Sequence, residues 1–234
     1  MILKPDDAAR LIAKTHSDRT VLIGGQAVSF WVKYFGLETK FPALTQDIDY
    51  LGTQAAAKFI SSRLGARLKA ATFDDATPIS AVMLVPLDGY PEPIVVDYMA
   101  SVVGLSTTDI EKSAVTVQLE DQKLKVLHPL LLLQSKIWNL YRIEGKRTPE
   151  GIEQARLSIA IAAAYVVKLN STKRDLLNSI EKIARFAATA PALYARDHFQ
   201  LNCLDAIPAA VFEEGVLPRE FHEQRWPRLL KAIK

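Results

Sequence analysis

The stretch "TVLIGGQAVSFWVKYFG", Thr20–Gly36, decides how the N-terminal half of this chain is organised. It begins with a short β-branched run that favours a strand, and after Gly24 and Gly25 its apolar residues follow helical spacing. Two residues without side chains at such a corner let a ligand approach the backbone, and the first helical N–H groups then face an anion. A tight turn without a ligand has the same sequence, so the glycines alone leave both interpretations open. Ser29, one turn into the helix, is a further candidate phosphate contact.

The next apolar run, "TQDIDYLG" (Thr45–Gly52), contains two aspartates where a strand favours valine. In a strand, residues i and i+2 point to one face, roughly 6.6 Å apart along the chain, so Asp47 and Asp49 are expected to project together. Two carboxylates this close repel each other, and a divalent cation removes the conflict. Hard oxygen ligands suit Mg²⁺ or Mn²⁺. The alternative is a strand end with two solvated acids.

A third acid, Asp97, interrupts the apolar run "PIVVDYMA". A charge at such a position is unfavourable unless it is paired or bound to a metal, and an ion pair with a distant lysine or arginine is the alternative. If this strand lies beside the strand of Asp47 and Asp49, the three carboxylates converge. That arrangement suits two metal ions about 3.5–4 Å apart, as used in phosphoryl transfer.

These motifs resemble the nucleotidyltransferase superfamily of DNA polymerase beta. Its signature is an apolar strand, a glycine pair opening a helix, a D-x-D on the next strand and an acid on a later strand. Within the superfamily the chain is most similar to the bacterial AbiEii-type proteins, the toxin halves of type IV toxin–antitoxin pairs. The similarity rests on "GGQAV", on the Thr-x-Asp-x-Asp of "TQDID" and on the helix "HPLLLLQSKIWNL". It spans roughly residues 20–145.

The resemblance implies an NTP- and Mg²⁺-dependent (or Mn²⁺-dependent) enzyme in which Asp47, Asp49 and Asp97 bind metal and act in catalysis. Gly24, Gly25 and Ser29 would contact the nucleotide. The implied acceptor is tRNA or a protein side chain, small-molecule adenylylation stays open, and a cognate antitoxin is an expected partner. The competing function is an inactive nucleotidyltransferase scaffold that binds nucleotide or a partner.

Two features depart from the family pattern. The loop "GLETKFPAL" lengthens the segment between Gly25 and Asp47 and is expected to be an insertion near the site. Relatives carry a Lys-Asp pair and an arginine after the lysine-bearing helix, and this chain has no matching aspartate in "YRIEGKRTPEGIEQAR". The acceptor side of the site is therefore the least defined.

Lys136 lies on a helical stripe that is otherwise apolar. One interpretation is a lysine whose stem packs while its ammonium reaches water. The other, favoured by the resemblance, is a cation that contacts the triphosphate.

Strands alternating with helices, followed by hairpin signals, predict a mixed sheet, and the chain becomes helical from Pro129 onward. We therefore expect an α+β protein: a nucleotidyltransferase-type mixed sheet with flanking helices in residues 1–127 and an α-helical domain in residues 128–234.

The composition is that of an ordinary globular protein, with 234 residues, 49% hydrophobic content and a formal net charge of +3. Cys203 is the sole cysteine, so neither an internal disulfide nor a cysteine zinc cluster is expected. No signal peptide and no apolar run near the length of a membrane span is apparent, which predicts a cytoplasmic protein without membrane contact.

Overall fold

The computed structural model describes residues 3–39, 45–72, 75, 77–119, 122–168, 173–213 and 215–233. The chain divides into two compact units. The first comprises Met1–Phe30 and Lys40–Leu131, and the second comprises Trp31–Thr39 and Leu132–Lys234. The sequence pattern predicted a boundary between residues 127 and 128. The boundary between the units lies a few residues later, inside a helix, and residues 40–44 of the predicted insertion lie outside the described part.

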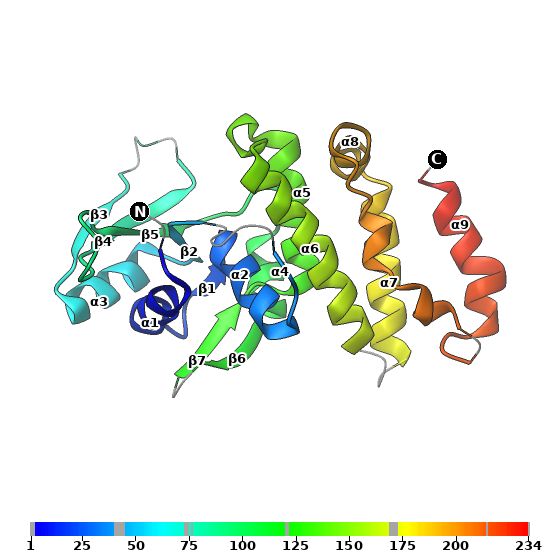
Figure 1. Cartoon of the computed structure of the whole chain (residues 1–234), viewed down its shortest axis with the longest axis horizontal. Coiled ribbons are helices and arrows are strands. Elements are labelled where there is room, and N and C mark those ends of the chain that lie inside the picture. The colour runs from blue at the N-terminus through cyan, green and yellow to red at the C-terminus, as the bar shows by residue number, and fades with distance from the viewer. Residues whose placement is uncertain are drawn as a thin grey trace. The chain divides into compact units, whose positions relative to one another are not determined.

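The first unit is built on one seven-stranded mixed sheet with the order β3-β4-β5-β2-β1-β7-β6 (Figure 1). Two neighbouring pairs, β2 with β5 and β1 with β7, are parallel, and the other pairs are antiparallel. The expected mixed sheet is therefore confirmed. The strands are β1 (Val21–Ile23), β2 (Ile48–Leu51), β3 (Arg67–Ala70), β4 (Ile79–Val85), β5 (Ile94–Met99), β6 (Val115–Leu119) and β7 (Gln122–Val126).

Four helices belong wholly or partly to this unit: α1 (Pro5–Thr15), α2 (Gly24–Phe35), α3 (Gln54–Leu64) and α4 (Thr107–Ser113). Their ends follow from local sequence. Proline and two acids occupy the first turn of α1, where they suit the free N–H groups and the helix dipole. The Thr53 side chain accepts a hydrogen bond from the N–H of Ala56 at the start of α3, and Gly65 ends that helix in the left-handed conformation.

Helices α1 and α3 cover one face of the sheet, as Figure 1 shows. On that face the rings of Tyr50 and Tyr98 stack with centroids 5.5 Å apart, and both side chains are fully buried. Their hydroxyl groups donate to carbonyls near the end of α1: Tyr98 to Thr15 at 2.8 Å and Tyr50 to Ile12 at 3.2 Å. Burial thus comes with satisfied hydroxyl groups and fixes α1 to this face. Residues that alternate with Tyr50 and Tyr98 must point to the opposite face.

The second unit is helical. Its longer helices are the greater part of α5 (Pro129–Arg142), then α6 (Pro149–Lys168), α7 (Lys173–Ala187), α8 (Ala190–Phe199) and α9 (Trp226–Lys231). Short turns connect them: η1 (Glu144–Lys146), η3 (Cys203–Ala206), η4 (Ala209–Phe212) and η5 (Phe221–Arg225).

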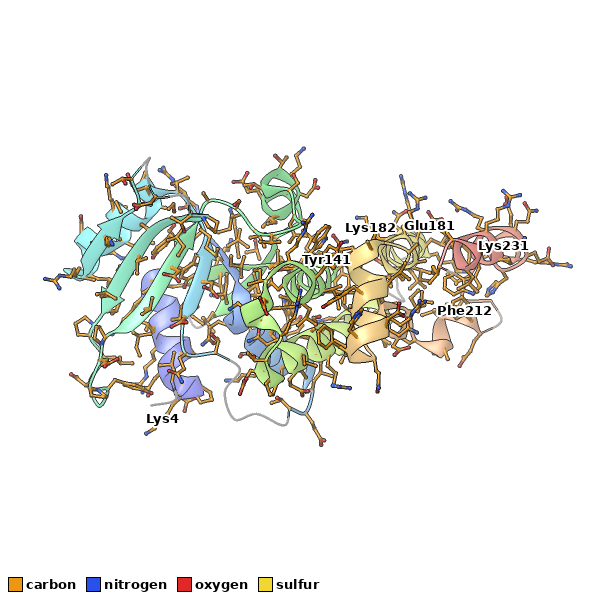
Figure 2. All side chains as sticks on the ribbon, turned by 90° about the horizontal axis from the view of Figure 1, so that it is seen from above. Lys4, Tyr141, Glu181, Lys182, Phe212 and Lys231 are labelled. Atoms are coloured by element: carbon orange, nitrogen blue, oxygen red, sulfur yellow. The ribbon has the colours of Figure 1, made fainter. Side chains whose placement is uncertain are left out.

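An ion pair links helix α7 to the short turn η5. Glu181 on α7 pairs with Arg185 at 3.2 Å and with Arg225 at 2.7 Å. Figure 2 shows Glu181 on the helix beside α9, which carries Lys231. Cys203 is buried with the pKa of its thiol raised to about 12, chiefly by burial, so it is an inert core residue.

A candidate three-carboxylate site on the open sheet face

The parallel pairing of β2 and β5 brings two of the predicted acids together. Asp49 and Asp97 are register partners on adjacent strands, so their side chains project from the same face of the sheet. Each alternates with one of the two stacked tyrosines, which places the acids opposite the face that α1 and α3 cover. Residues separated by nearly fifty positions in the sequence thus become direct neighbours.

Asp97 is electrostatically unfavourable as it stands. Its side chain is half-buried, and its Oδ1 atom is buried without a hydrogen-bond partner in the described structure. Burial, then the negative charge of Asp49, then that of Asp47 raise the pKa of Asp97 to about 6. A buried carboxylate among like charges is destabilised unless a cation joins it.

Asp47 lies just outside the strand that the sequence predicted for it. Strand β2 begins at Ile48, and Asp47 occupies a bend whose backbone N–H donates to Thr45 Oγ1 at 3.4 Å. Its carboxylate is exposed, yet its charge still acts on Asp97. The same-face argument therefore applies to Asp49 and Asp97, while Asp47 joins them from the chain segment that leads into β2.

Gly24 is the first residue of α2 and lies directly against Asp49. Ile23, the residue before it, pairs with Asp49 across β1 and β2. Gly24 has a φ of +67°, and a Cβ atom built there would lie 1.8 Å from Asp49 Oδ2. Both the backbone conformation and the space require glycine at this position. Gly24, Asp49 and Asp97 thus lie side by side in the first unit.

The other predicted nucleotide contacts in α2 are less distinctive. The Ser29 hydroxyl donates to the Gly25 carbonyl at 3.2 Å, a common arrangement for serine inside a helix. Gln26, for which no role was predicted, is a buried polar side chain in the first turn of α2 with 6% of its surface exposed.

Lys136 belongs to the second unit. It is 5% exposed, and its ammonium donates to Gln154 Oε1 on α6 at 2.7 Å. The Lys136 side chain is thus largely enclosed by the protein, and its ammonium is hydrogen-bonded there. A triphosphate contact at Lys136 stays a prediction.

An open cavity of about 360 Å³ lies beside Asp47. Its lining includes Leu3, Gln46, Asp47, Tyr90, Glu92 and Val95. The Tyr90 hydroxyl donates to Asp7 Oδ2 and accepts from the Lys4 N–H, each at 2.9 Å. These bonds tie the β4–β5 hairpin to the start of α1 and hold one wall of the cavity, whose volume falls within the range of small-ligand sites.

The chemistry of the three acids suits a hard divalent cation. No group of three or more histidine, cysteine, aspartate or glutamate residues in the described ranges is arranged so that it could hold a metal ion as it stands. The fit rests instead on all-oxygen donors, on the unpartnered Oδ1 of Asp97 and on repulsion that a cation would relieve. Mg²⁺ keeps several of its waters in protein sites, so it does not demand a complete cage of side chains.

The sequence matches no protein-family model, and a search of curated proteins finds no match. None of the helices in the described residues is both long and apolar enough to cross a membrane.

Proposed function

We propose that this chain is a metal-dependent nucleotidyltransferase that transfers a nucleoside monophosphate from an NTP to an acceptor hydroxyl. The observation that carries the proposal is the register of β2 and β5, which sets Asp49 beside Asp97 and against Gly24. The order strand, glycine pair, helix, D-x-D strand and later acidic strand is also that of the nucleotidyltransferase-type fold that the sequence resembles.

The triphosphate is assigned to the β1–α2 side of Asp49. Gly24 leaves the backbone open there, and the first N–H groups of α2 favour an anion. Gly25 and Ser29 lie in the same helix and remain the proposed further contacts. Lys136 remains a proposed contact, which requires its ammonium to exchange Gln154 for phosphate.

Asp47, Asp49 and Asp97 would hold Mg²⁺ or Mn²⁺, which when bound neutralises the triphosphate and stabilises the charge that develops on the leaving pyrophosphate. Asp97 receives the proton of the acceptor hydroxyl. Without a cation, burial and the charges of Asp49 and Asp47 raise the pKa of Asp97 to about 6, so the carboxylate is mostly ionised at neutral pH and can bind a cation or accept a proton.

The transfer forms one bond and breaks one. The acceptor oxygen bonds to the α-phosphorus, the bond from that phosphorus to the bridging oxygen breaks, and pyrophosphate leaves. Positioning and charge neutralisation supply most of the acceleration in such reactions. The resemblance to type IV toxins extends the proposal to tRNA, protein or small-molecule acceptors and to a cognate antitoxin.

The test is transfer of label from each α-labelled NTP, with Mg²⁺, into the RNA, protein or small-molecule fractions of a cell extract. Wild type is compared with Asp49→Asn and with Asp109→Asn, an exposed aspartate on α4 of the same unit. We expect label in one fraction with wild type and Asp109→Asn and none with Asp49→Asn. Nucleotide binding without transfer by wild type would favour the inactive scaffold, and equal Mn²⁺ and NTP binding by wild type and Asp49→Asn would overturn the site.

A further inference from the structure

The face of the sheet that carries the acids continues past them to a basic edge. The register of β2, β5, β4 and β3 lines up two cross-strand rows on this face. One row is Asp49, Asp97, Val82 and Lys69, and the other is Val95, Leu84 and Arg67. Paired residues of neighbouring strands point to the same side, so the face passes from carboxylates through aliphatic side chains to two cations.

The two faces of these strands differ in burial. On the face toward α1 and α3, Val96, Met83 and Ala81 are fully buried. On the acidic face, Val82, Leu84 and Val95 are only partly buried, and Arg67 and Lys69 are exposed. The acidic face therefore presents aliphatic surface and two cations to a ligand.

The strand order assigns the two substrates to opposite sides of the acids. Gly24 lies on the β1 side of Asp49, where the triphosphate is proposed, whereas Asp97 lies on the β5 side. An acceptor whose hydroxyl reaches Asp97 therefore approaches over β4 and β3. At about 4.8 Å between strands, the backbone of Lys69 lies roughly 10 Å from that of Asp97.

Resting on the proposed function, we propose that Arg67 and Lys69 bind a phosphate group of the acceptor while its hydroxyl lies at Asp97. Two cations at positions i and i+2 of one strand face suit the charge of phosphate, and the arginine fork matches its oxygens. Val82 and Leu84 supply the aliphatic contact between the two ends. The phosphate belongs either to a small phosphorylated acceptor or to a nucleic-acid strand, and the test separates these sources.

Lys69 has an acidic neighbour in Asp75. The Asp75 carboxylate accepts hydrogen bonds from the Thr72 N–H at 2.8 Å and from the Thr72 hydroxyl at 3.0 Å. These bonds, and to a smaller extent the charge of Lys69, lower the pKa of Asp75. Both bonds end on Oδ2 of Asp75, and no ion pair within 4 Å joins Lys69 to Asp75 among the described residues, so the Lys69 ammonium can turn toward a phosphate.

The test measures binding of two probes to the full chain with Mg²⁺ and a saturating non-hydrolysable NTP analogue. The probes are adenosine 5′-monophosphate and a 5′-labelled RNA trinucleotide with a free 3′-hydroxyl. For wild type we expect one probe to bind, and for Arg67→Gln/Lys69→Gln we expect at least tenfold weaker binding of that probe. If the trinucleotide is the probe that binds, the slope of log affinity against log salt should fall by about 0.7, because both side chains are proposed to contact one phosphate group of a single strand.

The matched control is Lys14→Gln/Lys58→Gln, which removes two exposed lysines from α1 and α3 on the opposite face. It should bind both the analogue and the probe as wild type does. Binding of the analogue by Arg67→Gln/Lys69→Gln establishes that this variant is folded.

The possible results distinguish failure of the phosphate contact at Arg67 and Lys69 from failure of the proposed nucleotidyltransferase function. If wild type binds the analogue but neither probe, or if Arg67→Gln/Lys69→Gln binds the probe as tightly as wild type, this inference is overturned and the proposed function stands. If wild type binds no nucleotide at all, the proposed function fails and takes the inference with it. Binding of the monophosphate alone identifies a small acceptor, and binding of the trinucleotide alone identifies a strand.

Discussion

Asp97 and Lys136 are both charged side chains in apolar surroundings, and their environments are opposite. Lys136 is the more buried of the two, yet its ammonium has a neutral amide oxygen 2.7 Å away on Gln154. Asp97 is only half-buried, but it has a buried oxygen without a partner and two negative neighbours that, after burial itself, raise its pKa. Burial alone therefore does not mark a functional charge.

The difference lies in whether the fold provides a hydrogen-bonding partner for the buried charged group. A satisfied buried charge contributes to one defined packing, whereas an unsatisfied one among like charges lowers stability until a ligand arrives. Removing the two charges should consequently have opposite effects on stability.

The largest effect is expected for Asp97→Asn. Transfer activity should fall on the order of 10³-fold or more, because the variant loses both the proposed cation ligand and the proposed proton acceptor. The thermal unfolding midpoint without metal should rise at pH 7.5, because repulsion among the acids is relieved. Activity assays and melting curves of wild type, Asp97→Asn and Asp109→Asn measure both. A lower midpoint for Asp97→Asn would show that Asp97 is satisfied in the native state and would remove the contrast with Lys136.

Gly24→Ala sharpens the comparison by displacing a neighbour of Asp97. The added methyl group would collide with Asp49 Oδ2, so we expect transfer to fall by about 10²-fold because the carboxylate shifts. The left-handed backbone at Gly24 adds a stability loss of roughly 1–3 kcal/mol. Gly65→Ala is the matched control, because Gly65 has a φ of +62° but a methyl group added there would have no neighbouring atom within 4 Å. Gly65→Ala should lose stability and keep its transfer activity. Equal activity of Gly24→Ala and Gly65→Ala would contradict the placement of the reaction at Asp49.

The sequence predicted most of the elements that carry the site. The strand before the glycine pair, helix α2, the hairpin of β4 and β5 and the long helices from α5 onward are confirmed. Strand β3 was missed because "RLKA" has none of the β-branched or aromatic residues that favour a strand. Helix α4 was missed because its seven residues are too few to show helical periodicity.

The electrostatics of the site could be predicted only in part. The positions of Asp49 and Asp97 in apolar runs indicated charges in unfavourable places, but their register depends on which strands pair, which is a long-range property. Gly24 and Gly25 are equivalent candidates in the sequence, whereas the structure distinguishes Gly24 by its φ and its contact with Asp49. The hydrogen bond from Lys136 to Gln154 was not predictable, because Gln154 lies on another helix.

Lys136→Met tests the hydrogen-bonded charge in the comparison of Asp97 with Lys136. Removing the ammonium leaves Gln154 without that donor, and we expect the free energy of unfolding to fall by about 1–3 kcal/mol. Lys136→Met/Gln154→Leu, which replaces both partners with apolar groups, should recover part of that loss. Denaturant unfolding measures the stabilities. Nucleotide titration of the same variants tests the proposed triphosphate contact, which requires weaker binding for Lys136→Met and near wild-type binding for Gln154→Leu.

The smallest effect is expected in the pH dependence of stability. The pKa of Asp97 is raised from 3.8 in the unfolded chain to about 6 in the fold, so the folded state binds the proton more tightly. Its destabilising effect is therefore absent below about pH 4, develops between pH 4 and 6, and is complete above that window. The stability advantage of Asp97→Asn over wild type should grow across this window and then level off. Mn²⁺ at pH 7.5 should reduce the advantage, because the cation stabilises wild type more than the variant; an advantage that is constant from pH 4 to 8 would show that the pKa of Asp97 is not raised in the fold.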